Sequence, residues 1–127
     1  MRSLLAVAVL IGCAAGCTPA GEQAARQTAE QFQTAVRSGD WAAACRLFSD
    51  EARSGLESAS TRPCPEAVAA LRLPGGPLGH DEVWGRDAQV GLDSGVLFLA
   101  EFRAGWRVTA AGCTSRPDQP YDCKVEG

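Results

Sequence analysis

The sequence predicts a single small α+β domain, in which N-terminal helices pack on an antiparallel sheet of three or four strands. Apolar residues between Glu22 and Leu71 recur every three or four positions, which is the periodicity of amphipathic helices. From Asp81 the period changes to two, and short turn-forming segments separate the apolar runs, as in strands joined by hairpins. The chain has 127 residues, which is enough for one such domain but not for two.

The first expected helix runs from Glu22 to Ser38 and stops at Gly39, a residue type that favours helix C-termini. Its apolar residues fall on one face at spacings of three and four, and its polar residues, including Gln33, lie away from that face. The apolar stripe consists of Ala25, Ala29, Phe32 and Val36. We expect this stripe to pack against the rest of the domain.

Two shorter helices are expected before the sheet begins. Asp40 is a good N-cap for the first of them, and Ser49 is a candidate cap for its short continuation. Pro65 suits the first turn of the last helix, because the N–H that proline lacks would have no intrahelical partner there. Residues 74–77, which read Pro-Gly-Gly-Pro, mark the change from helices to strands.

Strands are expected at residues 87–93, 96–103 and 106–110, joined by tight turns. The middle run is apolar on both faces from Val96 to Ala100, which is typical of a central strand covered by helices. The segment from Cys113 to Gly127 is rich in turn-forming residues and has little apolar surface to offset its ordering entropy. We expect it to be a loop closed by a disulfide, with Tyr121 folded back on the sheet.

The N-terminal residues have the composition of an export signal. Arg2 precedes an apolar run from Leu4 to Ile11, which is too short to span a bilayer and is followed by small residues. We therefore predict a signal peptide at residues 1–16, a lipidated cysteine with a linker at residues 17–21, and a single domain at residues 22–127.

The sequence Ala14-Ala15-Gly16-Cys17 resembles the lipobox of bacterial lipoproteins. This resemblance implies a thioether-linked diacylglycerol on Cys17 and cleavage just before it. Two acyl chains anchor a protein stably where one chain does so marginally. A similar pattern ends at Cys13, but lipid on Cys13 would leave Cys17 as an odd thiol. The expected location is the extracytoplasmic face of the cell membrane, with the membrane itself bound through the lipid anchor.

Four further cysteines follow the lipobox, at positions 45, 64, 113 and 123. An even number in a small exported domain indicates disulfides, and four cysteines allow three connectivities. We expect the sequential pairs Cys45–Cys64 and Cys113–Cys123; a Cys45–Cys113 bond would instead staple a helix to the sheet. No Cys-x-x-Cys spacing occurs and the chain has one histidine, so neither a metal site nor a cofactor is expected.

The remaining candidates for chemistry are few. The net charge of −3 with scattered basic residues argues against nucleic-acid binding. His80 stands beside Asp81 and Glu82 and could act as a general base, but its lone occurrence and its expected loop position favour a solvated side chain. Four aromatic residues could line a ligand pocket or belong to the core: Trp41, Trp84, Trp106 and Tyr121.

Two resemblances can be named on these residues. The helix end at Ser38-Gly39-Asp40-Trp41, followed by a short helix and a sheet, resembles the nuclear transport factor 2-like, or cystatin-like, α+β cone. Residues 105–113 and 120–123 resemble actinobacterial lipoproteins of unassigned activity. The first resemblance implies a cone-like sheet and a fold that includes hydratases and isomerases with buried acid–base residues. This chain has no Asp–His pair at matching positions.

These observations predict a non-enzymatic binding or interaction module, tethered to the cell envelope and directed at an envelope protein. The alternative is a small-ligand pocket protein, or an isomerase- or hydratase-like enzyme, of the cone fold; a third hypothesis is a structural accessory of a membrane complex. A buried polar residue at the base of the cone would favour the ligand pocket. A solid apolar interior with an exposed apolar sheet face would favour a protein partner.

Overall fold

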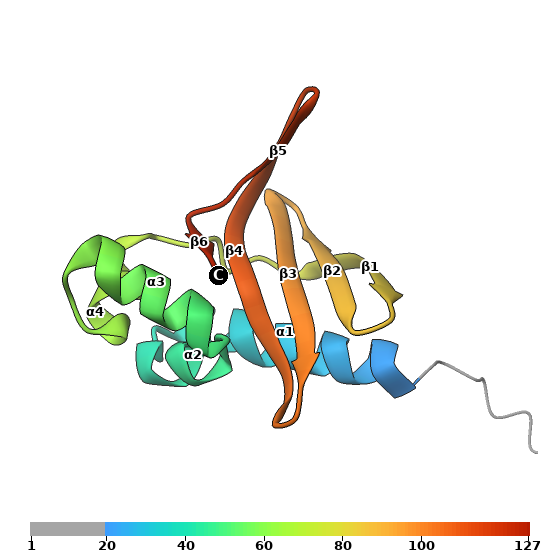
Figure 1. Cartoon of the computed structure of the whole chain (residues 1–127), viewed down its shortest axis with the longest axis horizontal. Helices are drawn as coiled ribbons and strands as arrows, with labels where there is room; N and C mark the ends of the chain where they lie inside the picture. The colour runs from blue at the N-terminus through green and yellow to red at the C-terminus, as the bar shows by residue number, and fades with distance from the viewer. Residues whose placement is uncertain (1–19) are drawn as a thin grey trace, which may run out of the picture.

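The computed structural model describes residues 20–127 (Figure 1). Its helices are α1 (Ala20–Ser38), α2 (Trp41–Leu47), α3 (Asp50–Ser60) and α4 (Cys64–Ala70). Its strands are β1 (Leu78–Trp84), β2 (Asp87–Leu92), β3 (Gly95–Phe102), β4 (Gly105–Arg116), β5 (Gln119–Asp122) and β6 (Val125–Glu126). The α+β class is confirmed, but this range has four helices rather than three and six strands rather than three or four. The predicted signal peptide, Cys13 and Cys17 lie outside the described residues.

The strands form one antiparallel sheet in the order β1-β2-β3-β4-β5, and β6 pairs with β4 beside β5. Helix α1 crosses one face of this sheet and contacts β1 to β4, while α3 lies along β4 and β6 (Figure 1). We call the face covered by α1 the inner face and the opposite one the outer face. Helices α2, α3 and α4 pack together beside the β4–β6 edge, so within residues 20–127 no helix layer lies across the outer face (Figure 1).

The core lies between α1 and the inner face. The alternation of each strand sends one set of apolar side chains inward, as the period of two requires. The buried residues of β2, β3 and the first part of β4 are Ala88, Val90, Leu97, Leu99, Trp106 and Val108, and they meet the predicted stripe Ala25, Ala29, Phe32 and Val36. Phe32 packs edge-to-face on Phe48 with ring centroids 5.2 Å apart. Burying each large apolar side chain contributes about 2 kcal/mol, so this layer dominates the stability of the fold.

The prediction that Gln33 lies on the polar side of α1 is wrong. Its side chain is buried, and its Nε2 donates hydrogen bonds to the carbonyl oxygens of Pro74 at 3.0 Å and Gly76 at 2.8 Å. These carbonyls belong to the loop between α4 and β1, where Arg37 of α1 also donates to the Gly75 carbonyl oxygen at 3.3 Å. Gln33 therefore ties that loop to α1, a role that helical periodicity cannot reveal.

The expected second helix is divided in two at Phe48. This residue is extended, with ψ of 150°, and forms a bridge with Val108 of β4. The next residue, Ser49, donates its N–H to the Val108 carbonyl oxygen at 2.9 Å, and its Oγ accepts from the N–H of Ala52 at 3.2 Å. The predicted cap is thus confirmed, but it begins a separate helix, because pairing with the sheet interrupts the helical hydrogen bonds.

Strand β4 continues to Arg116, beyond the expected end at residue 110. A bulge bends the strand near Gly112, and its pairing continues on the other side of the bulge. The register passes from Val96↔Cys113 to Phe98↔Ala110, so β4 carries an extra residue there. Gly112 has φ of +65°, the conformation found in a glycine bulge. The bend lets β4 follow the inner core and still reach the C-terminal hairpin.

The expected C-terminal loop contains β5 and β6. Strand β5 pairs with the end of β4 and has no buried residue, whereas Val125 of β6 is buried against the core. The expectation for Tyr121 is confirmed: its ring packs edge-to-face on Phe98, with centroids 5.2 Å apart. The segment forms strands because the exposed edge of β4 supplies the backbone partners that its composition did not indicate.

Candidate functional site

The two disulfides are Cys45–Cys64 and Cys113–Cys123, so the expected sequential pairing is confirmed. The first bond joins α2 to α4 within the core, where both cysteines are buried. The second joins β4 to the segment between β5 and β6, and Cys123 is partly exposed. Every cysteine within residues 20–127 is therefore paired, and the domain needs no further thiol for its own bonds.

The four aromatic residues predicted as a pocket are not brought together. Trp106 is buried on the inner face, and Trp41 of α2 packs at the margin of the helical core. Tyr121 lies on the outer face against Phe98, and Trp84 is exposed at the end of β1. The sheet separates Trp106 from Tyr121, so these side chains cannot line one shared cavity.

The outer face carries the half-exposed apolar surface of the domain. Phe98 and Ala100 alternate with the buried Leu97 and Leu99 and point outward, and neither belongs to the core cluster. Gln89 of the neighbouring strand donates from its Nε2 to the Tyr121 hydroxyl at 3.4 Å, which fixes the tyrosine ring over β3. The result is an aromatic patch of Phe98 and Tyr121 with polar neighbours, on a face that no helix of the described chain covers.

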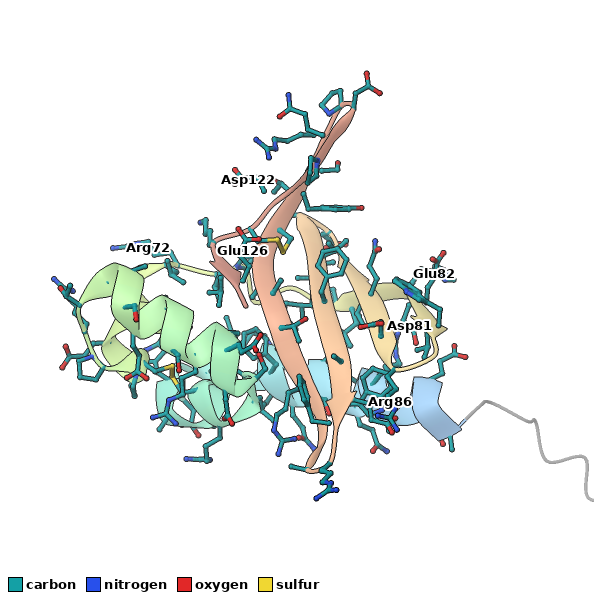
Figure 2. All side chains as sticks on the ribbon, viewed as in Figure 1. Arg72, Asp81, Glu82, Arg86, Asp122 and Glu126 are labelled. Carbon is teal, nitrogen blue, oxygen red and sulfur yellow. A yellow bond between two sulfur atoms is a disulfide. The ribbon has the colours of Figure 1, made fainter. Side chains whose placement is uncertain are left out.

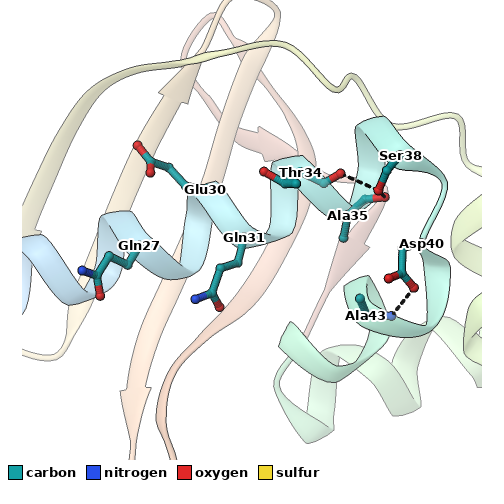
Figure 3. A pocket seen from close by; sticks show the side chains of 8 residues that line it. All are labelled: Gln27, Glu30, Gln31, Thr34, Ala35, Ser38, Asp40 and Ala43. Carbon is teal, nitrogen blue, oxygen red and sulfur yellow. Dashed lines mark hydrogen bonds between the residues drawn. The ribbon is translucent and has the colours of Figure 1, made fainter.

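A groove of about 430 Å³ runs along α1 and the start of α2 (Figure 3). Its lining combines amide and hydroxyl side chains with two carboxylates and two alanines, and it is open to solvent. Two of its polar groups are used by the helix ends: Ser38 Oγ donates to the Thr34 carbonyl oxygen at 2.8 Å, and the Ala43 N–H donates to Asp40 Oδ1 at 3.1 Å. The lining residues are Gln27, Glu30, Gln31, Thr34, Ala35, Ser38, Asp40 and Ala43.

An ion pair that the sequence did not indicate joins α1 to β1. Arg26 Nη1 lies 2.8 Å from Asp81 Oδ1 and donates to the Gly79 carbonyl oxygen at 3.0 Å. The Asp81 side chain is only 12% exposed, whereas that of Arg26 is 35% exposed. Because the arginine also binds backbone, the pair holds the first strand against the helix. Its two members stand 55 positions apart, so no local pattern links them.

His80 lies in strand β1 and not in the expected loop. Its side chain is 84% exposed, and its Nε2 is 3.6 Å from Glu82 Oε1, which is itself exposed. A general base needs a substrate position beside it and some shielding from water, and this surface offers neither. Among residues 20–127, no three His, Cys, Asp or Glu side chains gather as a metal ligand set would.

The chain was compared with known proteins. No protein-family model, no curated protein and no solved structure matches it. Among the helices at residues 20–127, none combines the length and apolar character needed to cross a membrane.

Proposed function

We propose that the protein is a lipoprotein anchored at the extracytoplasmic face of the cell membrane, where its domain binds a protein partner without catalysing a reaction. The observation that best supports an exported, lipid-anchored protein is the pairing of all four domain cysteines. Stable disulfides form in oxidising compartments, which suits export. The pairing also leaves the lipobox residue Cys17 unneeded for the fold and available for the diacyl anchor.

The binding role rests on the contrast between interior and outer face. The interior is apolar, and its two buried polar side chains, Gln33 and Ser49, have backbone hydrogen-bond partners. The buried Oδ2 of Asp81 has no hydrogen-bond partner, but its carboxylate is paired with Arg26 through Oδ1. The outer face presents Phe98 and Tyr121. Gln89 borders both, because it pairs with Phe98 and donates to the Tyr121 hydroxyl. A filled interior beside an uncovered aromatic face favours a protein partner over an enclosed small ligand.

The exposed setting of His80 supports a role without catalysis, because its imidazole is 84% exposed and its nearest acidic partner, Glu82, is also exposed. The glycine bulge at Gly112 bends β4, and a bent sheet covered by one long helix supports placing the domain among the nuclear transport factor 2-like cones. The proposed relationship to these cones concerns the fold alone. It brings no substrate and no catalytic residue to this chain.

The anchor is tested by mass spectrometry of the protein extracted from membranes. We expect the mature chain to begin at Cys17 with a diacylglycerol adduct and to continue with Thr18. Cys17→Ala should leave the precursor uncleaved or release the protein, and the matched variant Cys13→Ala should be processed normally. Lipid on Cys13 would move the site and keep the protein class, whereas an unmodified, freely secreted chain would overturn the proposal.

The partner face is tested by photo-crosslinking in intact cells. A photoreactive residue in place of Gln89 should give one discrete adduct, because this position borders Phe98 and Tyr121. The same residue in place of Gln31, which is exposed on the far side of α1, is the matched control and should give none. Equal crosslinking from both positions would show that the outer face is not a specific binding surface.

A further inference from the structure

The β1–β2 turn, the β3–β4 turn and the start of α1 lie on the same side of the molecule (Figure 1). The turn between β1 and β2 is joined to β3 by the Glu101 N–H, which donates to the Arg86 carbonyl oxygen at 2.8 Å. The start of α1 lies beside the start of β4, because a Cβ added to Gly21 would be 4.0 Å from the Trp106 ring. Figure 2 shows Arg86 near the N-terminal end of α1. We call this part of the domain the anchor end.

The anchor end carries the two most exposed large apolar side chains of the described residues. Trp84 is 50% exposed at the end of β1, and Phe102 is 48% exposed at the end of β3. Each is the last residue of a strand entering a turn, and each pairs with the first residue of the next strand. Both therefore stand at the rim of the sheet, where a flat surface meeting the turns would contact both.

Chain length limits how far this end can be from a lipid on Cys17. The helix begins at Ala20, three residues later, and consecutive Cα atoms are 3.8 Å apart, so the two Cα atoms lie within about 11 Å of each other. The far end of the sheet is out of reach: β4 has 12 residues, and at about 3.3 Å per residue it places Arg116 some 35 Å away.

The anchor end has no excess of basic side chains, because Arg107 lies beside Phe102 in a cavity that Asp50 and Glu51 also line. Arg86 is followed by Asp87, and Arg103 lies two positions from Glu101 in the other hairpin. An electrostatic attraction to anionic lipids would need an excess of basic side chains, which this end does not have. Tryptophan and phenylalanine can instead contribute by entering the interfacial layer, where aromatic side chains concentrate at membrane surfaces.

We infer that Trp84 and Phe102 enter the headgroup region of the bilayer that holds the lipid on Cys17. The anchor end therefore contacts a lipid surface, and this surface can be zwitterionic. The sheet then stands on the membrane with its strands pointing outward, and the β4–β5 hairpin lies at the distal end. The inference rests on the proposed anchor, and it adds a second, non-covalent contact that orients the domain.

The test uses the full lipidated protein in phosphatidylcholine vesicles with brominated acyl chains, which quench nearby tryptophan. Flotation of the protein with the vesicles reports the anchor by itself. We expect quenching in the native chain, loss of most of it in Trp84→Phe, and its retention in the matched variant Trp41→Phe. If the protein fails to float, the proposed anchor fails; if it floats and Trp84→Phe changes nothing, only the inference fails.

Reporter variants in the Trp84→Phe chain sharpen the result. Phe102→Trp should restore quenching, because its side chain would enter the same layer. Tyr121→Trp should not restore it, because this position lies on the outer face near the distal hairpin. Adding anionic lipid should leave the quenching unchanged. Restoration by Tyr121→Trp, or quenching that appears only with anionic lipid, would overturn the proposed orientation.

Discussion

The helical region and the C-terminal hairpin each contain one disulfide, but the two bonds serve segments of opposite character. Cys45 and Cys64 join α2 to α4 among buried side chains, so burial and the bond act on the same residues. Cys113–Cys123 closes a segment whose strand β5 is exposed at every position. In the hairpin, the disulfide and the pairing with β4 must together replace the apolar burial that holds the helices.

This difference teaches how a disulfide should be interpreted. Where the bond lies inside a cooperative core, its loss lowers the stability of the whole domain. Where it closes a surface segment, its loss can be absorbed by local opening, and the remainder of the fold is less affected. Loss of a disulfide therefore destabilises the whole domain in the helical region, whereas in the hairpin it mainly destabilises the segment that the bond closes.

The largest effect is expected from removing the helical bond. The Cys45→Ala and Cys64→Ala double variant should lower the free energy of unfolding by about 3–4 kcal/mol, because the bond closes a loop with a sequence separation of 19. Urea titration of the ellipticity measures this loss. The matching pair of serine substitutions should lose more, since it adds two buried hydroxyls. A loss below about 1 kcal/mol would show that burial alone holds α2 to α4.

Removing the hairpin bond should cost less and act locally. Cys113→Ala with Cys123→Ala should lower the free energy of unfolding by about 2 kcal/mol. Amide hydrogen exchange should accelerate at residues 114–122 and remain slow in α1, and chymotrypsin should cut after Tyr121. The contrast between the two regions fails if exchange accelerates equally throughout the domain.

The smallest effect separates backbone strain from packing in the two regions. Gly39 at the end of α1 and Gly112 in the β4 bulge have similar positive φ, +70° and +65°. A Cβ on Gly39 would meet nothing within 4 Å, whereas one on Gly112 would lie 3.0 Å from Leu73 Cδ2 and from Lys124 Cβ. Gly112→Ala should therefore destabilise the domain by about 1 kcal/mol more than Gly39→Ala, measured by thermal unfolding. Equal losses would mean that the bulge yields to the new methyl group.

The helices were predictable because their signals are local. The buried stripe of α1, the cap at Asp40 and the early position of Pro65 in α4 all depend on neighbours within one or two turns. The even number of cysteines after the lipobox predicted two disulfides, and the expected sequential pairing was one of the three connectivities that this number allows. The turn between β2 and β3 was equally predictable, because the strands expected at residues 87–93 and 96–103 leave only two residues between them.

The missed features depend on partners far along the chain. Strand β6 has one buried residue, Val125, and exists because β4 offers it an edge. Gln33 is buried because a loop more than 40 positions away needs its amide. The aromatic pocket failed for a related reason: parity along β4 and the fold-back of β5 put Trp106 and Tyr121 on opposite faces. No periodicity within a single segment contains that information.

The order of the cysteines has a consequence for how the protein matures. Each disulfide joins a cysteine to the next one along residues 20–127. A chain that leaves a translocation pore N-terminus first presents Cys45 and Cys64 before Cys113 has emerged. An oxidase that joins each thiol to the next to appear would make both native bonds directly, with no thiol–disulfide exchange needed to correct them. The protein's biogenesis should therefore be insensitive to the loss of a disulfide isomerase and sensitive to the loss of the oxidase.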